Sequence, residues 1–178
     1  MRIVSGKFKG RRIETPHTIQ ARPTTDFAKE GLFNVLNNWI DFEGMNVLDL
    51  FAGTGSISLE FVSRGAKSVI SVEQNERHCS FIRKTCSQLG VDNLLLTRGD
   101  VFRLIATTRM KFDVIFADPP YELEQLPQLP DLIFKYDLLN AEGLFILEHS
   151  AKNNFENHPY FSEHRTYGNV NFSFFEKK

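Results

Sequence analysis

Short apolar runs alternate with longer amphipathic stretches from residue 46 to residue 148, and this alternation limits the possible folds more than any other feature. The runs "NVLDLF", "DVIFA" and "LFILE" are apolar almost throughout, as is typical of strands covered on both faces. The expected strands are 46–51, 68–72, 94–97, 112–117 and 143–148, and the expected helices between them are 56–64, 75–89, 101–108 and 124–137. Strands separated by helices favour right-handed crossovers. We therefore expect an α/β fold, a three-layer sandwich around a mostly parallel sheet.

Both ends of the chain depart from this alternation. Residues 1–16, "MRIVSGKFKGRRIETP", alternate roughly and carry glycine breakers, which predicts a twisted β-hairpin. The stripe in "DFAKEGLFNVLNNWI" predicts a helix capped by Thr25 or Asp26. In "HRTYGNVNFSFFEKK" a Gly-Asn pair lies between two extended runs, which indicates a second hairpin. We therefore expect one domain, 1–178, with an N-terminal β-hairpin extension and an antiparallel pair at the end of the sheet.

Charge is unevenly distributed along the chain. The net charge is −1, but residues 1–29 hold seven Lys or Arg against two Asp or Glu, a net of +5, so that the remainder carries −6. A basic end on a slightly acidic body indicates a contact with an anionic partner, and a solvated surface hairpin is an equal alternative. The cations of the expected hairpin are Arg2, Lys7, Lys9, Arg11 and Arg12.

Neither a membrane segment nor a metal site is expected. No apolar run is long enough to cross a bilayer, and the N-terminus lacks the apolar segment of a signal peptide. Cys79 and Cys86 match no metal or redox spacing, and the five histidines are scattered. We interpret the cysteines as free thiols in a reducing compartment, so the expected localisation is cytoplasmic.

Three loops should meet at one edge of the sheet, because ligands of doubly wound sheets bind beyond the carboxyl ends of the strands. Gly53 and Gly55 in "DLFAGTGS" let a ligand approach the backbone and leave helix amides for an anionic group. Glu73, twenty residues past Gly53, suits ribose hydroxyls, and Asp100 suits an exocyclic amine. Taken singly, the glycines could serve packing, Glu73 could be a solvated acid and Asp100 a helix cap. Together they predict a nucleoside site.

The motifs "LDLFAGTGSISLE", "VE", "GDVF" and "DPPY", in this order, resemble the class I methyltransferases that use S-adenosylmethionine, and "DPPY" marks those that methylate an exocyclic amine. "RIVSGKFKGRRI", "RPTTD", "LFNVL" and "YGNVNFSFFE" extend the similarity over essentially the whole chain. The chain resembles the bacterial family that methylates N2 of a guanine in small-subunit (16S) ribosomal RNA. This resemblance implies a Rossmann-like sheet of seven strands, the last antiparallel. It also implies a ribosomal RNA partner, which could be part of an assembling small subunit.

The resemblance further implies two sets of site residues. The cofactor contacts would be Phe51, Gly53, Gly55, Glu73, Asp100 and Val101, and the base-binding residues would be Asp118, Pro119 and Tyr121. The lone pair of an aromatic amine is delocalised into the ring. The Asp118 carboxylate and the Pro119 carbonyl could accept its two N–H groups and so turn the lone pair toward the methyl donor. The prolines would keep the loop rigid. The ring of Tyr121 would stack on the base, and its hydroxyl would be incidental.

Several alternatives remain open. An adenine-N6 methyltransferase fits "DPPY" as well, and a nucleic-acid-binding module could keep a cofactor pocket without turnover. A dinucleotide oxidoreductase is disfavoured because Ser58 occupies the place of the third fingerprint glycine. Arg22 and Thr24 could form a lid or a plain loop. Glu148 and His149 end the last parallel strand at the same edge, where a structural histidine is favoured.

Overall fold

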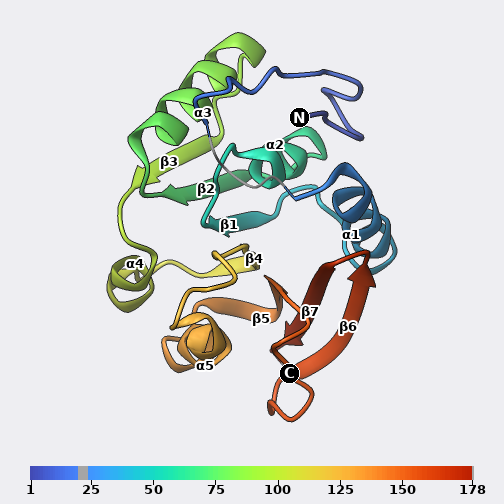
Figure 1. Cartoon of the computed structure of the whole chain (residues 1–178), viewed down its shortest axis with the longest axis vertical. Coiled ribbons are helices and arrows are strands. Elements are labelled where there is room, and N and C mark those ends of the chain that lie inside the picture. Colours follow the sequence, from blue (N-terminus) through green and yellow to red (C-terminus); the bar gives the residue numbers. More distant parts are fainter. Residues whose placement is uncertain (20–23, 178) are drawn as a thin grey trace.

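The computed structural model describes residues 1–19 and 24–177. Its core is a seven-stranded sheet of order β3-β2-β1-β4-β5-β7-β6 (Figure 1). The strands are β1 Asn46–Leu50, β2 Ser68–Glu73, β3 Leu94–Arg98, β4 Phe112–Ala117, β5 Leu139–His149, β6 Phe161–Tyr167 and β7 Val170–Glu176. Strands β1 to β5 are parallel, whereas β7 is antiparallel to both of its neighbours. The predicted mostly parallel sheet with an antiparallel C-terminal strand is confirmed.

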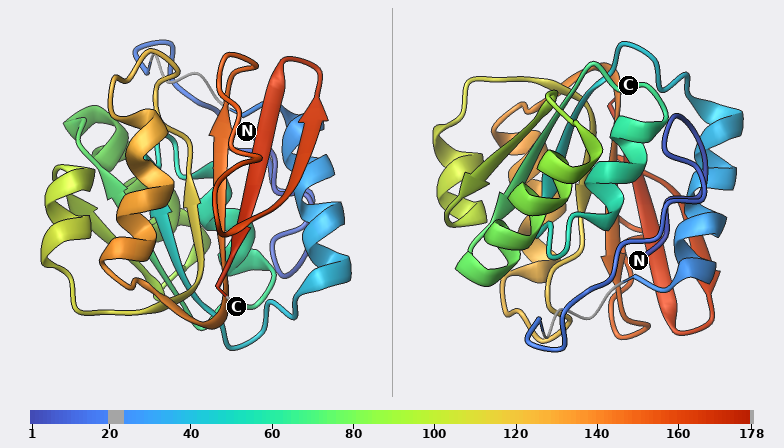
Figure 2. Two further views of the ribbon diagram at one scale, coloured as in Figure 1. Left: turned by 90° about the horizontal axis from the view of Figure 1, so that it is seen from below. Right: turned by 90° about the horizontal axis from the view of Figure 1, so that it is seen from above.

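Helices cover both faces of this sheet (Figure 2). They are α1 Asp26–Trp39, α2 Ser56–Ser63, α3 Glu76–Leu89, α4 Val101–Thr107 and α5 Leu129–Lys135, with a short 3-10 helix η1 at Leu126–Gln128. The apolar stripes of α1 and α2 pack on one face together with the end of α3, and those of α4 and α5 pack on the other. The predicted three-layer sandwich is therefore present, with an apolar core on each side of the sheet.

Two predicted elements differ from the observed ones by more than one residue. The helix expected at 124–137 is divided into η1 and the shorter α5, because Pro127 and Pro130 each lack the N–H that a continuous helix would need. Strand β5 starts at Leu139, earlier than the expected residue 143. The apolar pattern did not reveal this start because the pairing with β4 is irregular there and Glu142 has a φ of 63°.

The N-terminal extension folds back on itself as a short, irregular hairpin and has no regular strands. A single antiparallel bridge joins Arg2 and Arg12. Backbone hydrogen bonds of 2.9–3.0 Å also join the two arms, between Met1 and Ile13 in both directions, from Ile3 to Arg11 and from Gly10 to Ile3. Other backbone groups bond to α2: the Val4 and Ser5 amides donate to Glu60 at 2.8 and 3.1 Å, and the Lys7 amide donates to the Ser63 carbonyl at 2.7 Å. The segment is therefore an irregular hairpin that also lies against α2.

Buried charge holds this segment in place. Lys29 on α1 and Glu60 on α2 are both fully buried, with their charged atoms 3.4 Å apart. The Lys29 ammonium also donates to the carbonyl of Arg2 at 2.5 Å and to the Ser56 hydroxyl at 3.0 Å. Burial lowers the pKa of Lys29, and the nearby Glu60 carboxylate opposes this effect.

Candidate active site

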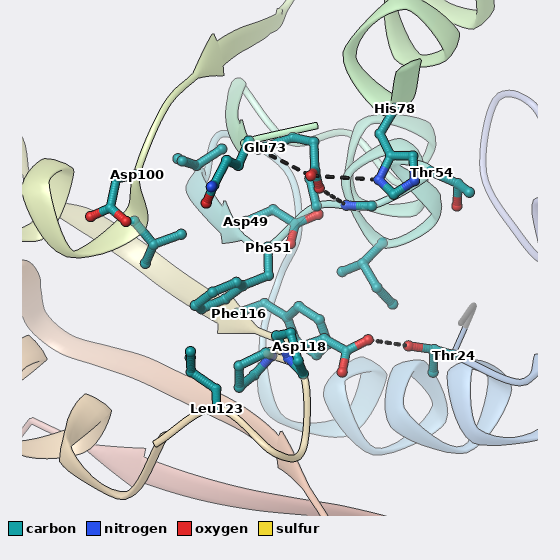
Figure 3. A pocket seen from close by; sticks show the side chains of 18 of the residues that line it. Thr24, Asp49, Phe51, Thr54, Glu73, His78, Asp100, Phe116, Asp118 and Leu123 are labelled. Atoms are coloured by element: carbon teal, nitrogen blue, oxygen red, sulfur yellow. Dashed lines mark hydrogen bonds and ion pairs between the residues drawn. The ribbon is translucent and has the colours of Figure 1, made fainter. Parts of the chain in front are cut away.

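A cavity of about 610 Å³ lies beyond the carboxyl ends of the first four strands (Figure 3). Eight of the nine predicted site residues line it: Phe51, Gly53, Glu73, Asp100, Val101, Asp118, Pro119 and Tyr121. Gly55 does not line the cavity; it precedes α2, and a Cβ atom there would come within 3.1 Å of the Ile82 side chain. The structure thus brings the predicted cofactor and base-binding residues to one place, and their individual roles stay predictions.

The loop between β1 and α2 has an unusual backbone. Phe51, Gly53 and Gly55 have φ values of 60°, 58° and 79°, in the left-handed region that few residues other than glycine adopt. An aromatic residue in this conformation is strained unless its surroundings hold it. The Phe51 ring packs edge-on against Phe102 of α4, with centroids 6.4 Å apart. This contact keeps the ring at the cavity wall.

Glu73 fastens two of the loops together. One carboxylate oxygen accepts the Gly53 amide at 2.6 Å, and the other accepts the amides of Gln74 and Asn75, each at 3.0 Å. His78 of α3 lies beside it, with its Nδ1 atom 3.5 Å from Oε1. The carboxylate is therefore not the solvated loop acid that the sequence left open, because it fixes the glycine loop to the end of β2.

Asp100 combines the two roles that the sequence left as alternatives. Its side chain caps α4 by accepting the Arg103 amide at 2.9 Å, and the residue also lines the cavity. Val101, the first residue of α4, is buried beside it at the cavity wall. Capping and ligand contact are compatible here, because a carboxylate has about four acceptor positions.

The "DPPY" loop leaves β4 next to the end of β5. The Asp118 carboxylate points toward Thr24 (Figure 3), and the Thr24 hydroxyl lies 3.4 Å from Asp118 Oδ2 and 2.9 Å from Glu148 Oε2. The Tyr121 hydroxyl donates to Glu148 Oε1 at 3.1 Å. The hydroxyl of Tyr121 is thus part of a hydrogen-bond network that the sequence did not predict.

Sequence reasoning missed Asp49, a buried carboxylate that also lines the cavity. It accepts the Ser58 hydroxyl at 2.5 Å, and Ser58 lies 2.6 Å from the Ser71 hydroxyl. Burial raises the pKa of Asp49 to about 7, against the opposing effect of the Ser58 hydrogen bonds, and the charge of Glu73 raises it further. The available signal was an acid inside an otherwise apolar strand. Ser58, which departs from the dinucleotide fingerprint, serves this buried network.

Other candidates lie elsewhere. His149 is buried, with Nε2 2.7 Å from the Ser173 hydroxyl and Nδ1 2.8 Å from the Ser150 carbonyl, which matches the favoured structural interpretation. Arg22 lies outside the described residues. Within residues 1–19 and 24–177, no cluster of three His, Cys, Asp or Glu could hold a metal ion. The helices of these same ranges include none of the length and apolarity needed to cross a membrane.

Comparisons with known proteins place the chain in a family. The family model described as "Conserved hypothetical protein 95" matches residues 1–176. A Ribosomal RNA small subunit methyltransferase D of Buchnera aphidicola is 32% identical over 83% of this chain and 75% of its own length. The protein of that name from Escherichia coli K12 is 29% identical over 86% of this chain and 76% of its own length.

The fold has close counterparts among solved structures. A hypothetical protein of Thermus thermophilus superposes with a TM-score of 0.87 at 26% identity, covering 99% of both chains. Both the sequence and the fold therefore agree with the motifs around the cavity. The chain belongs to the Conserved hypothetical protein 95 family, and its relatives include the ribosomal RNA small subunit methyltransferases D.

Proposed function

We propose that this protein transfers a methyl group from S-adenosylmethionine to the N2 amine of a guanine in small-subunit (16S) ribosomal RNA. The observation that carries the proposal is the charge of the cavity beside the "DPPY" loop. Four acidic side chains, those of Asp49, Glu73, Asp100 and Asp118, line this cavity, and its described lining includes no lysine or arginine. Such a cavity attracts a positively charged ligand and repels phosphates.

S-adenosylmethionine fits this cavity by charge and by chemistry. It carries a sulfonium, an ammonium and a carboxylate group and so has a net positive charge, whereas the dinucleotide of an oxidoreductase carries a pyrophosphate that the acids of the cavity would repel. Gly53 and Glu73 would hold its ribose side, and Asp100 and Val101 would hold its adenine. When bound, it supplies an electrophilic methyl group. The comparisons support this choice, because the named relatives are methyltransferases.

The "DPPY" loop supplies the groups that act on the amine. The Asp118 carboxylate and the Pro119 carbonyl would each accept one N–H of the amine, which directs its lone pair toward the methyl donor. Little reorganisation is needed, because the two prolines keep the loop rigid. The Tyr121 ring would stack on the base. The amine releases its proton after transfer, to Asp118 or to water.

The RNA substrate and the guanine rest on the relatives' names and on the resemblance of the motifs. A base inside folded RNA must leave its stack to reach the cavity. An adenine amine would suit the same loop, so the product must be identified base by base. Nuclease digestion and mass spectrometry of methylated 16S RNA, offered free and within partly assembled small subunits, distinguish N2-methylguanosine from N6-methyladenosine.

Asp118→Ala tests the assigned chemistry. We expect the single-turnover rate of methyl transfer to fall at least ~100-fold, as on loss of one preorganised polar group at a reacting centre, with folding and cofactor affinity retained. Glu122→Ala is the matched control, because Glu122 is an exposed acid of the same loop and does not line the cavity. A folded Asp118→Ala protein that transfers methyl at the parent rate would refute the mechanism.

A further inference from the structure

Glu148 is a buried carboxylate whose position the proposed chemistry does not yet explain. It lies near the end of β5, opposite Phe172 of β7, and it is fully buried. Its neighbours in the strand, Ile146 and Leu147, are apolar core residues. A carboxylate at such a place is unfavourable unless hydrogen bonds satisfy it.

Among the described residues, two segments of the site donate hydrogen bonds to it, one to each carboxylate oxygen. Oε1 accepts the hydroxyl of Tyr121 from the "DPPY" loop at 3.1 Å. Oε2 accepts the hydroxyl of Thr24, just before α1, at 2.9 Å. Hydrogen bonds to a charged acceptor are about twice as strong as neutral ones. Glu148 therefore connects the base-binding loop with the segment that precedes the first helix.

The Thr24 hydroxyl has a single proton and two carboxylates within reach. It lies 2.9 Å from Glu148 but 3.4 Å from Asp118, so Glu148 is the nearer acceptor for this proton. Because Glu148 takes this proton, Thr24 does not compete with a substrate amine for the Asp118 carboxylate. This arrangement suits an Asp118 that must accept from the substrate.

We propose that Glu148 is a positioning residue for the transfer reaction. It fixes the tilt of the Tyr121 ring through the phenol and draws the Thr24 proton away from Asp118. This inference rests on the proposed function. Glu148 does not line the cavity, so it acts through Tyr121 and Thr24 and touches neither the base nor the methyl donor.

A double-mutant cycle of Glu148→Gln and Tyr121→Phe tests the proposal. Each single change should slow methyl transfer about tenfold at saturating RNA and cofactor, the effect of one hydrogen bond to a charged group. The Kd of the cofactor should not change. Glu148→Gln replaces the charged acceptor of the Tyr121 hydroxyl by a neutral one and also alters the Thr24 bond, whereas Tyr121→Phe removes the Tyr121 bond alone. Because the Tyr121–Glu148 bond is common to both changes, their effects should not add, and the double variant should be about as slow as Glu148→Gln. Glu142→Gln, at an exposed acid of the same strand, is the control and should transfer at the parent rate.

Three results would overturn the proposal: Glu148→Gln at the parent rate, Tyr121→Phe at the parent rate, or a double variant about 100-fold slower. Tyr121→Phe decides the question alone if Glu148→Gln does not fold. NMR of the ¹³C-labelled Tyr121 ring separates this proposal from the function on which it rests, because it needs no substrate. Unchanged ring resonances in Glu148→Gln refute the positioning role, whereas a parent protein that methylates no RNA refutes the proposed function.

Discussion

Replacing Glu73 by alanine removes the carboxylate that holds two loops of the cavity together, and the structure sets the size of the effect. Three backbone amides lose their acceptor. The bond to Gly53, at 2.6 Å, is short and partly buried, and it should contribute about 1.5–3 kcal/mol as a hydrogen bond to a charged group. The bonds to Gln74 and Asn75 are exposed, so water replaces them. We expect the free energy of unfolding to fall by about 2 kcal/mol.

Cofactor affinity should fall separately from stability. The backbone bonds occupy about three of the four acceptor positions of the carboxylate, which leaves room for about one ribose hydroxyl. Loss of that contact, together with a loosened Gly53 loop, should weaken cofactor binding by about 1–3 kcal/mol. Calorimetric titration with S-adenosylmethionine measures the affinity, and urea unfolding measures the stability.

Two further variants make the Glu73 experiment specific. Glu73→Gln keeps one acceptor oxygen, so its losses should lie between those of the parent and the alanine variant. Glu76→Gln changes an exposed acid in the first turn of α3 that does not line the cavity, and it should leave the affinity unchanged. If folded Glu73→Ala binds the cofactor with parent affinity, Glu73 does not belong to the cofactor site. If its unfolding free energy is unchanged, the carboxylate does not hold the loops.

Two other predictions concern pH and salt. The pKa of Asp49 is raised from 3.8 to about 7 in the folded state. Between these pH values the folded state holds a proton that the unfolded state has lost. The contribution of Asp49 to stability is therefore fully present below pH 3.8 and is lost as the pH rises to 7. Asp49→Asn should remove up to roughly 4 kcal/mol of the loss in unfolding free energy between pH 4 and 8, as measured by urea unfolding. An unfolding free energy that depends on pH as in the parent would contradict this prediction. Neutralising the exposed cations of the N-terminal segment should flatten the salt dependence of RNA binding by roughly one unit per lost contact, without changing cofactor affinity. The cations to neutralise are Lys7, Lys9, Arg11 and Arg12, because Arg2 pairs with Glu30. If the variant binds RNA with the same salt dependence as the parent, the segment is only a surface feature.

The parallel core was predictable because its signals are local. Apolar runs such as "DVIFA" specify strands that are covered on both faces, and the residues after them reach one edge whatever the details of packing. This is why Glu73, Asp100 and Asp118 could be placed in one cavity from the sequence alone. Their hydrogen-bond partners could not be predicted, because Gly53 and Thr24 reach them only through tertiary structure.

The N-terminal segment shows where local signals fail. Its alternation predicted a twisted β-hairpin. The arms do pair at Met1 with Ile13 and at Ile3 with Arg11, but the amides of Val4 and Ser5 bond to Glu60, which is far away in the sequence. Gly6 was interpreted as a breaker, whereas a Cβ atom there would lie 1.9 Å from the Ser63 carbonyl oxygen, so the close approach to α2 requires glycine. A tertiary contact decided the backbone in both cases.

The glycine loop was predicted to leave amides for an anionic group of the ligand, and the structure changes this expectation at Gly53. The amide of Gly53 already donates to the carboxylate of Glu73, so the protein supplies its own anion at that position. A phosphate there would have to displace a fixed carboxylate and would meet the negative charge of Asp118 nearby. The Gly-x-Gly turn binds pyrophosphates in other proteins, but here it is suited to a positively charged ligand. The charge around the turn therefore distinguishes a methyl donor from a dinucleotide more clearly than the spacing of the glycines does.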